Sequence, residues 1–118
     1  MRAISASMTK AQVRDRSKTE TRRLGWLHAR AGMRLRVVEK CMGLRKGEKL
    51  KELAIVEIVE VRREPLNRIT QEAVIREGFP NWTPAQFIEF FCKAMRREPK
   101  TPVTVIRWRY IESEAPHA

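Results

Sequence analysis

The sequence predicts a small α+β domain in which a curved sheet or barrel is covered by helices. Three observations lead to this prediction. The chain has 118 residues, which is enough for one modest core and too few for two. Two long stretches with the pattern of strands, 31–40 and 51–65, follow one another. Helical patterns precede and follow these strands and do not alternate with them, which is typical of α+β domains.

The N-terminal part opens with a strand and a short helix. Residues 1–7 alternate loosely between apolar and polar side chains, which favours a strand. Thr9 and Gln12 are spaced as in a capping box, so we expect a helix over 10–16. Gly25 then breaks the chain before the first long strand.

The two central strands give the clearest pattern. Apolar and basic side chains alternate with a period of two in 31–40, so one face is buried and the other carries Arg34 and Arg36. Residues 51–65 are rich in Val and Ile and end at a proline, which indicates a second strand. Two glycines mark the connection over 41–50 as a loop.

Two helices follow the central strands. Thr70 and Gly78 bound a short helix, and a capping box of Thr83 and Gln86 opens a longer one. The apolar face of the longer helix is expected to be buried and holds Phe87, Phe90, Phe91, Ala94 and Met95.

The last strand is predicted over 102–112. Its alternation places Ile106, Trp108 and Tyr110 on one face and Val105, Arg107 and Arg109 on the other. We therefore expect one domain over 1–112, with 113–118 as a flexible C-terminal tail.

The net charge is the strongest signal in the composition. Lys and Arg number 25 against 14 acidic residues, which gives a charge of +11 and a pI near 10.6. Solubility alone needs a net charge of only about 2–8 in a small domain. A field of this sign attracts polyanions, so we expect a nucleic acid as partner.

Other features bound the class of protein. No apolar run suits a membrane span or a secretory signal, so we expect a cytoplasmic protein without a membrane partner. Cys41 and Cys92 lack the spacing of a zinc site or a disulfide framework, and we expect two thiols. The histidines are His28 and His117, too few for a histidine metal site, so we expect neither a metal nor a cofactor.

A basic segment, "RSKTETRR" at 16–23, is the first candidate for a functional site. Its cations and hydroxyls suit a phosphate cradle, and a loop tryptophan beside it can stack on a base. The strand arginines form one positive wall if their two strands are neighbours. The candidate nucleic-acid-binding residues are Arg16, Lys18, Thr19, Arg22, Arg23, Trp26, Arg34, Arg36, Arg107 and Arg109.

Three segments together resemble the ASCH domains, a branch of the PUA-like β-barrel superfamily. They are "SKTETRR" at 17–23, the glycine-led strand "AGMRLRVVEK", and the corner, helix and strand "REGFPNWTPAQFIEFFCKAM" and "VTVIRWRYIE". The resemblance implies a barrel of five or six strands with flanking helices and a cleft used for RNA binding or nucleoside chemistry. Bacterial or phage members of similar length are the nearest in pattern.

The resemblance also implies a catalytic set. Some short bacterial members hydrolyse N4-acetylcytidine, and the matching positions here are Lys18, Thr21 and Glu77. A threonine hydroxyl attacks a carbonyl when a base removes its proton, and a lysine with a lowered pKa can be that base. Lys18 and Thr21 are three positions apart and would share a face in a helical turn.

Three functions stay open at this point. The first is binding of single-stranded RNA, or of a nucleotide fragment, in a basic cleft over 18–23. The second is hydrolysis of a modified nucleoside, or RNA cutting. The third is a phage-type accessory factor that binds another protein. In the binding interpretation Glu77 is only a surface partner of an arginine, and Glu20 is solvated.

Overall fold

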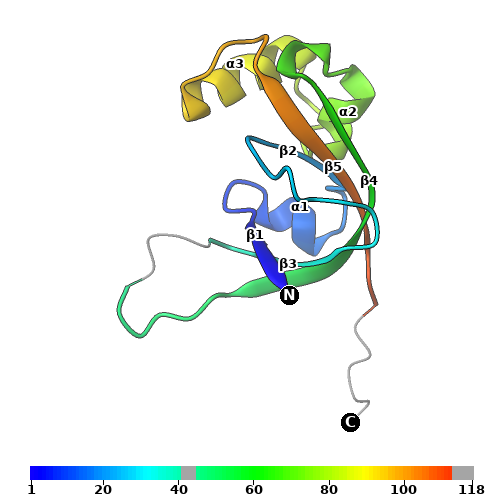
Figure 1. Cartoon of the computed structure of the whole chain (residues 1–118). Helices are drawn as coiled ribbons and strands as arrows, with labels where there is room; N and C mark the ends of the chain where they lie inside the picture. The colour runs from blue at the N-terminus through cyan, green and yellow to red at the C-terminus, as the bar shows by residue number, and fades with distance from the viewer. Residues whose placement is uncertain (41–44, 113–118) are drawn as a thin grey trace.

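A curled sheet of five strands forms the framework of the protein (Figure 1). The computed structural model describes residues 1–40 and 45–112. The strand order is β1-β3-β4-β5-β2, so β1 and β2 are the two edges. The strands are β1 (Arg2–Ser5), β2 (Glu20–Arg23), β3 (Arg34–Val38), β4 (Glu52–Pro65) and β5 (Pro102–Tyr110). This architecture confirms the predicted α+β class and the small curved sheet.

The predicted strands pair with one another, and a side-chain hydrogen bond links the two edge strands. β3, β4, β5 and β2 pair antiparallel in turn, and β1 adds to β3 in parallel. At the ends of the edge strands, the Arg23 guanidinium donates a hydrogen bond to the backbone carbonyl of Ser5. A side chain of β2 thus links to β1 although no backbone ladder joins the two edges in the described residues.

Four helical segments cover the sheet. α1 lies in the hollow of the curled sheet, while α2 and α3 lie together beyond one end of it (Figure 1). Their bounds are α1 (Lys10–Arg14), the 3₁₀ turn η1 (Leu66–Arg68), α2 (Gln71–Arg76) and α3 (Pro84–Met95). None of the helices in the described part of the chain is both long and apolar enough to cross a membrane.

Two hydrophobic cores form on the two faces of β5. Ile106 and Trp108 point into a first core with residues of β1, β3, β4 and Val13 of α1. Val103 and Val105 point into a second core with α2, α3 and η1. The alternation predicted for this strand is confirmed, and it explains why both faces hold apolar side chains.

Helix capping was predicted correctly at two helices and wrongly at the third. Thr83 and Gln86 form the capping box of α3, and the Thr70 hydroxyl accepts a hydrogen bond from Ala73 N–H at the start of α2. Thr9 makes no cap bond. The Gln12 amide instead donates to the Gly78 carbonyl at 3.0 Å, so this side chain joins α1 to the corner after α2.

The basic segment 16–23 is not the helical turn that the sequence suggested. α1 ends at Arg14, and Arg16 has a left-handed backbone with φ of +66°. Glu20–Arg23 then forms strand β2, paired with β5. In a strand, Glu20 and Arg22 share one face while Thr21 lies on the other. Cys41, His117 and the predicted tail 113–118 lie outside the described residues.

Candidate functional site

Lys18 is a buried cation whose amine has two acceptors on one residue. Only 3% of Lys18 is exposed. Its Nζ donates to the Glu77 backbone carbonyl at 2.8 Å and to Glu77 Oε1 at 3.0 Å. Glu77 is equally buried, so the two residues form an ion pair inside the protein although 59 positions separate them.

The backbone of Lys18 is held by elements from both halves of the chain. Its carbonyl accepts hydrogen bonds from Trp108 Nε1 at 3.0 Å and from the Tyr110 hydroxyl, both on β5. Its N–H donates to the Gln12 carbonyl of α1 at 3.1 Å. With its backbone fixed on both sides, Lys18 directs its amine inward.

Glu77 is positioned by the corner that ends α2. It is the C-cap of this helix, and Gly78 follows with φ of +107°. A Cβ at Gly78 would lie 3.1 Å from Cβ and Cγ of Gln12. Glycine is therefore required here twice, by the backbone conformation and by the approach of α1. The corner delivers Glu77 to Lys18 because α1 can pack this closely.

A second cation, Arg22, holds the other oxygen of Glu77. Arg22 Nη1 lies 3.3 Å from Glu77 Oε2 and 2.6 Å from Glu20 Oε2, and its Nη2 lies 3.1 Å from Glu64 Oε2. The Arg22 and Glu20 side chains are fully buried. Each oxygen of the Glu77 carboxylate therefore has its own cationic partner, Lys18 on Oε1 and Arg22 on Oε2.

Two expectations about this segment need correction. Glu20 is not solvated, since it is fully buried and its second oxygen accepts from Arg76 at 3.0 Å. The Arg22 side chain does not lie on the outer surface, since it is fully buried. Strand alternation turns both residues inward, and the surrounding carboxylates already compensate the charge of Arg22.

The surroundings of Lys18 favour its neutral form. Burial lowers the pKa of the Lys18 amine below its ordinary value of 10.5, and the charge of Glu77 opposes this shift. Desolvation acts in this direction because a charged amine loses more hydration than a neutral one. A lysine of this kind is a better proton acceptor than one in water.

Lys18, Thr21 and Glu77 all line one cavity of about 180 Å³. Its polar wall is completed by Arg22 and Arg23. The Thr21 hydroxyl accepts from Arg23 Nε at 3.2 Å, while both recorded bonds of the Lys18 amine go to Glu77. The rest of the lining is mainly apolar and comes from the end of β1 and the segment after it, from the corner after α2, and from α3: Ser5–Thr9, Phe79, Phe87, Phe90, Phe91, Ala94 and Met95.

The predicted apolar face of α3 is therefore shared between the core and the cavity. Phe87 and Phe91 are buried as expected. Phe90 is only half-buried, and Met95 is 45% exposed. Phe79 stacks on Trp82 with ring centroids 4.2 Å apart, which extends the aromatic group behind this wall.

The remaining candidates of the basic segment lie at the surface or serve the backbone. Arg16 is exposed and pairs with Glu112 at 2.7 Å. Thr19 links α2 to β5 through its backbone, since its N–H donates to Arg76 and its carbonyl accepts from Trp108. Trp26 is half-buried against the first core, with the Arg2 guanidinium 5.2 Å from its ring centroid.

The strand arginines do not form one positive wall. β4 separates β3 from β5 and places glutamates between their arginines. Glu57 lies 3.6 Å from Arg34 and 3.2 Å from Arg109. The pairs Arg36–Glu52 and Arg107–Glu60 extend this mixed ladder of charge.

Sequence reasoning missed two carboxylates around Arg22, the buried Glu20 and the partly buried Glu64. A signal exists for Glu20, because a glutamate and an arginine two positions apart face the same way in a strand. Glu64 reaches the site from β4 and carries no local signal. Within residues 1–40 and 45–112, no group of three histidines, cysteines or acidic residues is placed to hold a metal.

Comparison with solved structures finds three similar chains, among them the following two. An ASCH domain from Lactobacillus crispatus JV V101 superposes with a TM-score of 0.66 at 15% identity, over 92% of this chain and 79% of that one. A protein of family-model DUF984 from Enterococcus faecalis V583 gives a TM-score of 0.62 at 16% identity, over 93% and 75%. No family model and no curated protein matches the sequence. The likeness confirms the resemblance at the level of the fold: this chain has the fold of an ASCH domain.

Proposed function

We propose that the cavity hydrolyses the exocyclic amide of an N-acylated nucleobase, with N4-acetylcytidine as the reference substrate. The observation that carries this proposal is the position of Lys18, Thr21 and Glu77 on one cavity in which aromatic and aliphatic side chains face a polar wall. A planar base packs against such walls, and three convergent polar groups can act on a substituent at its edge.

The proposed reaction has two steps. Thr21 Oγ attacks the acyl carbonyl while the neutral Lys18 amine, turning from Glu77, accepts the hydroxyl proton. The carbon–nitrogen bond breaks as that proton passes by way of the Glu77 carboxylate to the leaving amine, which departs as cytidine. Water then cleaves the threonyl ester and releases acetate. Arg22, 3.3 Å from Glu77 Oε2, holds this carboxylate in position between turnovers.

Release of cytidine from N4-acetylcytidine tests the proposal. Thr21→Ala, Lys18→Met and Glu77→Gln should each lower the rate at least ~100-fold, and double variants should be little worse than single ones because the groups act together. Thr19→Ala is the matched control, since Thr19 does not line the cavity. No cytidine at high enzyme concentration, or equal rates for the two threonine variants, would overturn the proposal.

Binding of single-stranded nucleic acid is the second candidate function. It is favoured by the net charge of +11 and by the RNA binding that the resemblance to ASCH domains implies. With Arg22 buried, contacts would come from exposed cations such as Arg16. Titration of a labelled oligoribonucleotide at several salt concentrations measures this function, and an affinity independent of salt would contradict it.

A further inference from the structure

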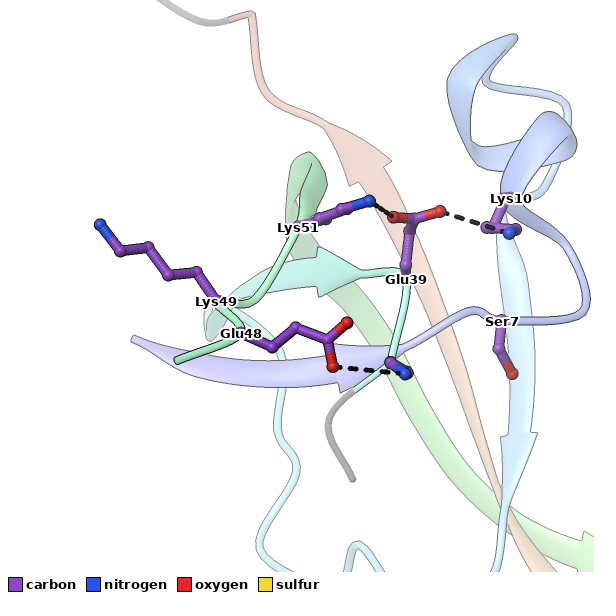
Figure 2. Close-up of a pocket in the computed structure, with 7 residues that line it drawn as sticks. Ser7, Lys10, Glu39, Glu48, Lys49 and Lys51 are labelled. Atoms are coloured by element: carbon purple, nitrogen blue, oxygen red, sulfur yellow. Dashed lines mark ion pairs between the residues drawn. The ribbon is translucent and has the colours of Figure 1, made fainter. Parts of the chain in front are cut away.

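A second hollow, of about 270 Å³, lies beside the segment that joins β1 to α1. We call it the lysine hollow. Four of its seven lining residues are lysines, and two are glutamates. The lining is Ser7, Lys10, Glu39, Lys40, Glu48, Lys49 and Lys51. Figure 2 shows Glu39 between Lys10 and Lys51, while Lys49 extends away from that carboxylate.

The positive charge of this hollow is only partly neutralised. Glu39 faces Lys10 at 3.3 Å, Lys51 at 3.8 Å and Arg14 at 3.9 Å, so three cations share one carboxylate. The hydrogen bond from Lys10 lowers the pKa of Glu39, which stays ionised at neutral pH. Among the described residues, Lys49 has no recorded ion pair.

The lysines of the hollow can leave their carboxylate partners and contact a ligand instead. The Lys10, Lys49 and Lys51 side chains are open to solvent, and exposed pairs at these distances are weak and screened by salt. Each lysine presents a compact charge on a flexible stem, which suits contact with a phosphate of variable position. A polyanion, which offers several phosphates at once, can therefore compete with these carboxylates for the amines.

The lysine hollow borders the cavity that holds Lys18. Ser7 lines both spaces. Ser5–Thr9 forms one wall of the cavity, and the next residue, Lys10, lines the lysine hollow. A ligand that fills the apolar cavity with a planar ring can therefore reach the lysines with an attached anionic group. Among polyanions, a nucleic acid combines a planar ring and an anionic group in every residue, whereas an acidic peptide has a ring only where it carries an aromatic side chain.

We propose that the lysine hollow binds backbone phosphates of an RNA strand whose base enters the adjoining cavity. The position of the base rests on the proposed function, whereas the phosphate site does not. The substrate would then be an acylated residue within a strand, and the free nucleoside would be only its minimal part.

A binding measurement tests the phosphate site without any catalysis. Lys49→Ala/Lys51→Ala should weaken the affinity for a fluorescent 12-residue oligoribonucleotide roughly tenfold at low salt. It should also reduce the slope of log K against log salt by about 1.4, since each phosphate contact of a single strand contributes about 0.7. The control Lys93→Ala/Lys100→Ala removes the same charge from exposed lysines outside both spaces. Equal losses in the two double variants would overturn the lysine hollow as a site.

A kinetic comparison tests whether the two spaces serve one ligand. The wild-type kcat/KM should be higher for N4-acetylcytidine placed within an oligoribonucleotide than for the free nucleoside. Lys49→Ala/Lys51→Ala should reduce the first value about tenfold and leave the second unchanged. If a 5′-mononucleotide gains as much as the strand, the ligand is a single phosphate and the strand proposal is wrong.

The outcomes separate the two proposals. If neither substrate is cleaved but the lysine variant alone loses RNA affinity, the hydrolase proposal fails and the phosphate site stands. If cleavage occurs and the lysine variant equals its control in both measurements, the phosphate site fails and the hydrolase proposal stands.

Discussion

At the scale of single residues, the protein buries more charge than its fold needs. Lys18, Arg22, Glu20 and Glu77 are all at most 4% exposed. Desolvating such groups is expensive, and a hydrophobic replacement of a buried ion pair is often as stable. Groups of this kind with shifted pKa values are concentrated at functional sites. A buried cluster of this kind is what the proposed reaction in the cavity would require.

The stability effect of Glu77 follows from its two cations. Glu77→Gln removes the carboxylate that pairs with both Lys18 and Arg22. We therefore expect a loss of about 3–5 kcal/mol in the free energy of unfolding, which urea denaturation measures. The control Glu57→Gln removes a surface partner of Arg34 and Arg109 and should cost ~0–1 kcal/mol. Similar losses in both variants would contradict the buried network.

The lowered pKa of Lys18 predicts a dependence on pH. At a pH between the lowered pKa of folded Lys18 and the ordinary value of 10.5, the Lys18 amine is protonated in the unfolded chain and neutral in the folded chain. The free energy of unfolding therefore rises with pH in this range. The difference in stability between wild type and Lys18→Met should therefore grow as the pH increases toward 10.5. Urea unfolding over pH 6 to 10 measures it, and a difference that falls with pH would show a raised pKa instead.

At the scale of elements, the sequence predicted what local pattern encodes. Strands β3, β4 and β5 show alternation or β-branched runs, and α2 and α3 carry their caps. Strand β2 was missed because its four residues are all polar and its inward side chains are charged. Their burial depends on carboxylates from β4 and from the end of α2, which no local window contains.

The site was predictable only in part for the same reason. Lys18, Thr21 and Glu77 were chosen through the resemblance; all three line one cavity, and their catalytic role stays a prediction. The predicted arginine wall was wrong because strand order cannot be read from alternation, and β4 lies between β3 and β5. Phe90 was expected in the core because helical spacing does not separate a buried face from a cavity wall.

The cap of α3 predicts a modest and specific effect. Thr83→Ala removes the hydroxyl that accepts from Gln86 N–H at 3.1 Å, so it should cost about 1 kcal/mol in the free energy of unfolding. Thr83→Ser keeps an acceptor and should remain close to wild type. Chemical denaturation of the three proteins measures the effect, and equal losses would argue against a capping role.

The corner after α2 predicts a larger effect. Gly78→Ala forces a side chain into a backbone with φ of +107° and against Gln12, so we expect a loss above about 1 kcal/mol. Gly47→Ala is the control, since Gly47 also has a positive φ, of +83°, but faces open space. The Gly78 variant should be the less stable in thermal unfolding, and the reverse order would contradict the close approach of α1.

At the scale of the whole molecule, β5 joins parts that would otherwise be separate. It supplies one face to each core, pairs with both β4 and β2, and holds the Lys18 carbonyl through Trp108 and Tyr110. The charged network around Arg22 joins β2, β4 and the end of α2. The two cores should therefore unfold together.

Coupled unfolding can be measured with a fluorescent reporter in one core and a destabilising substitution in the other. In a Trp82→Phe background, Trp26 and Trp108 report on the first core. Val105→Ala, which alters the second core, should shift the fluorescence midpoint as much as the circular dichroism midpoint. A shift in circular dichroism alone would show that the cores unfold independently.

The central place of β5 also bears on how the protein is made. Strand β2 leaves the ribosome early, yet the strand with which it pairs is synthesised some eighty residues later. Until β5 emerges, the nascent chain exposes Glu20 and Arg22 and cannot fix Lys18, so no partial product can carry the cavity. Pairing between strands so far apart in the sequence, such as β2 and β5, slows folding. Fragments that end before β5 should therefore lack the cavity.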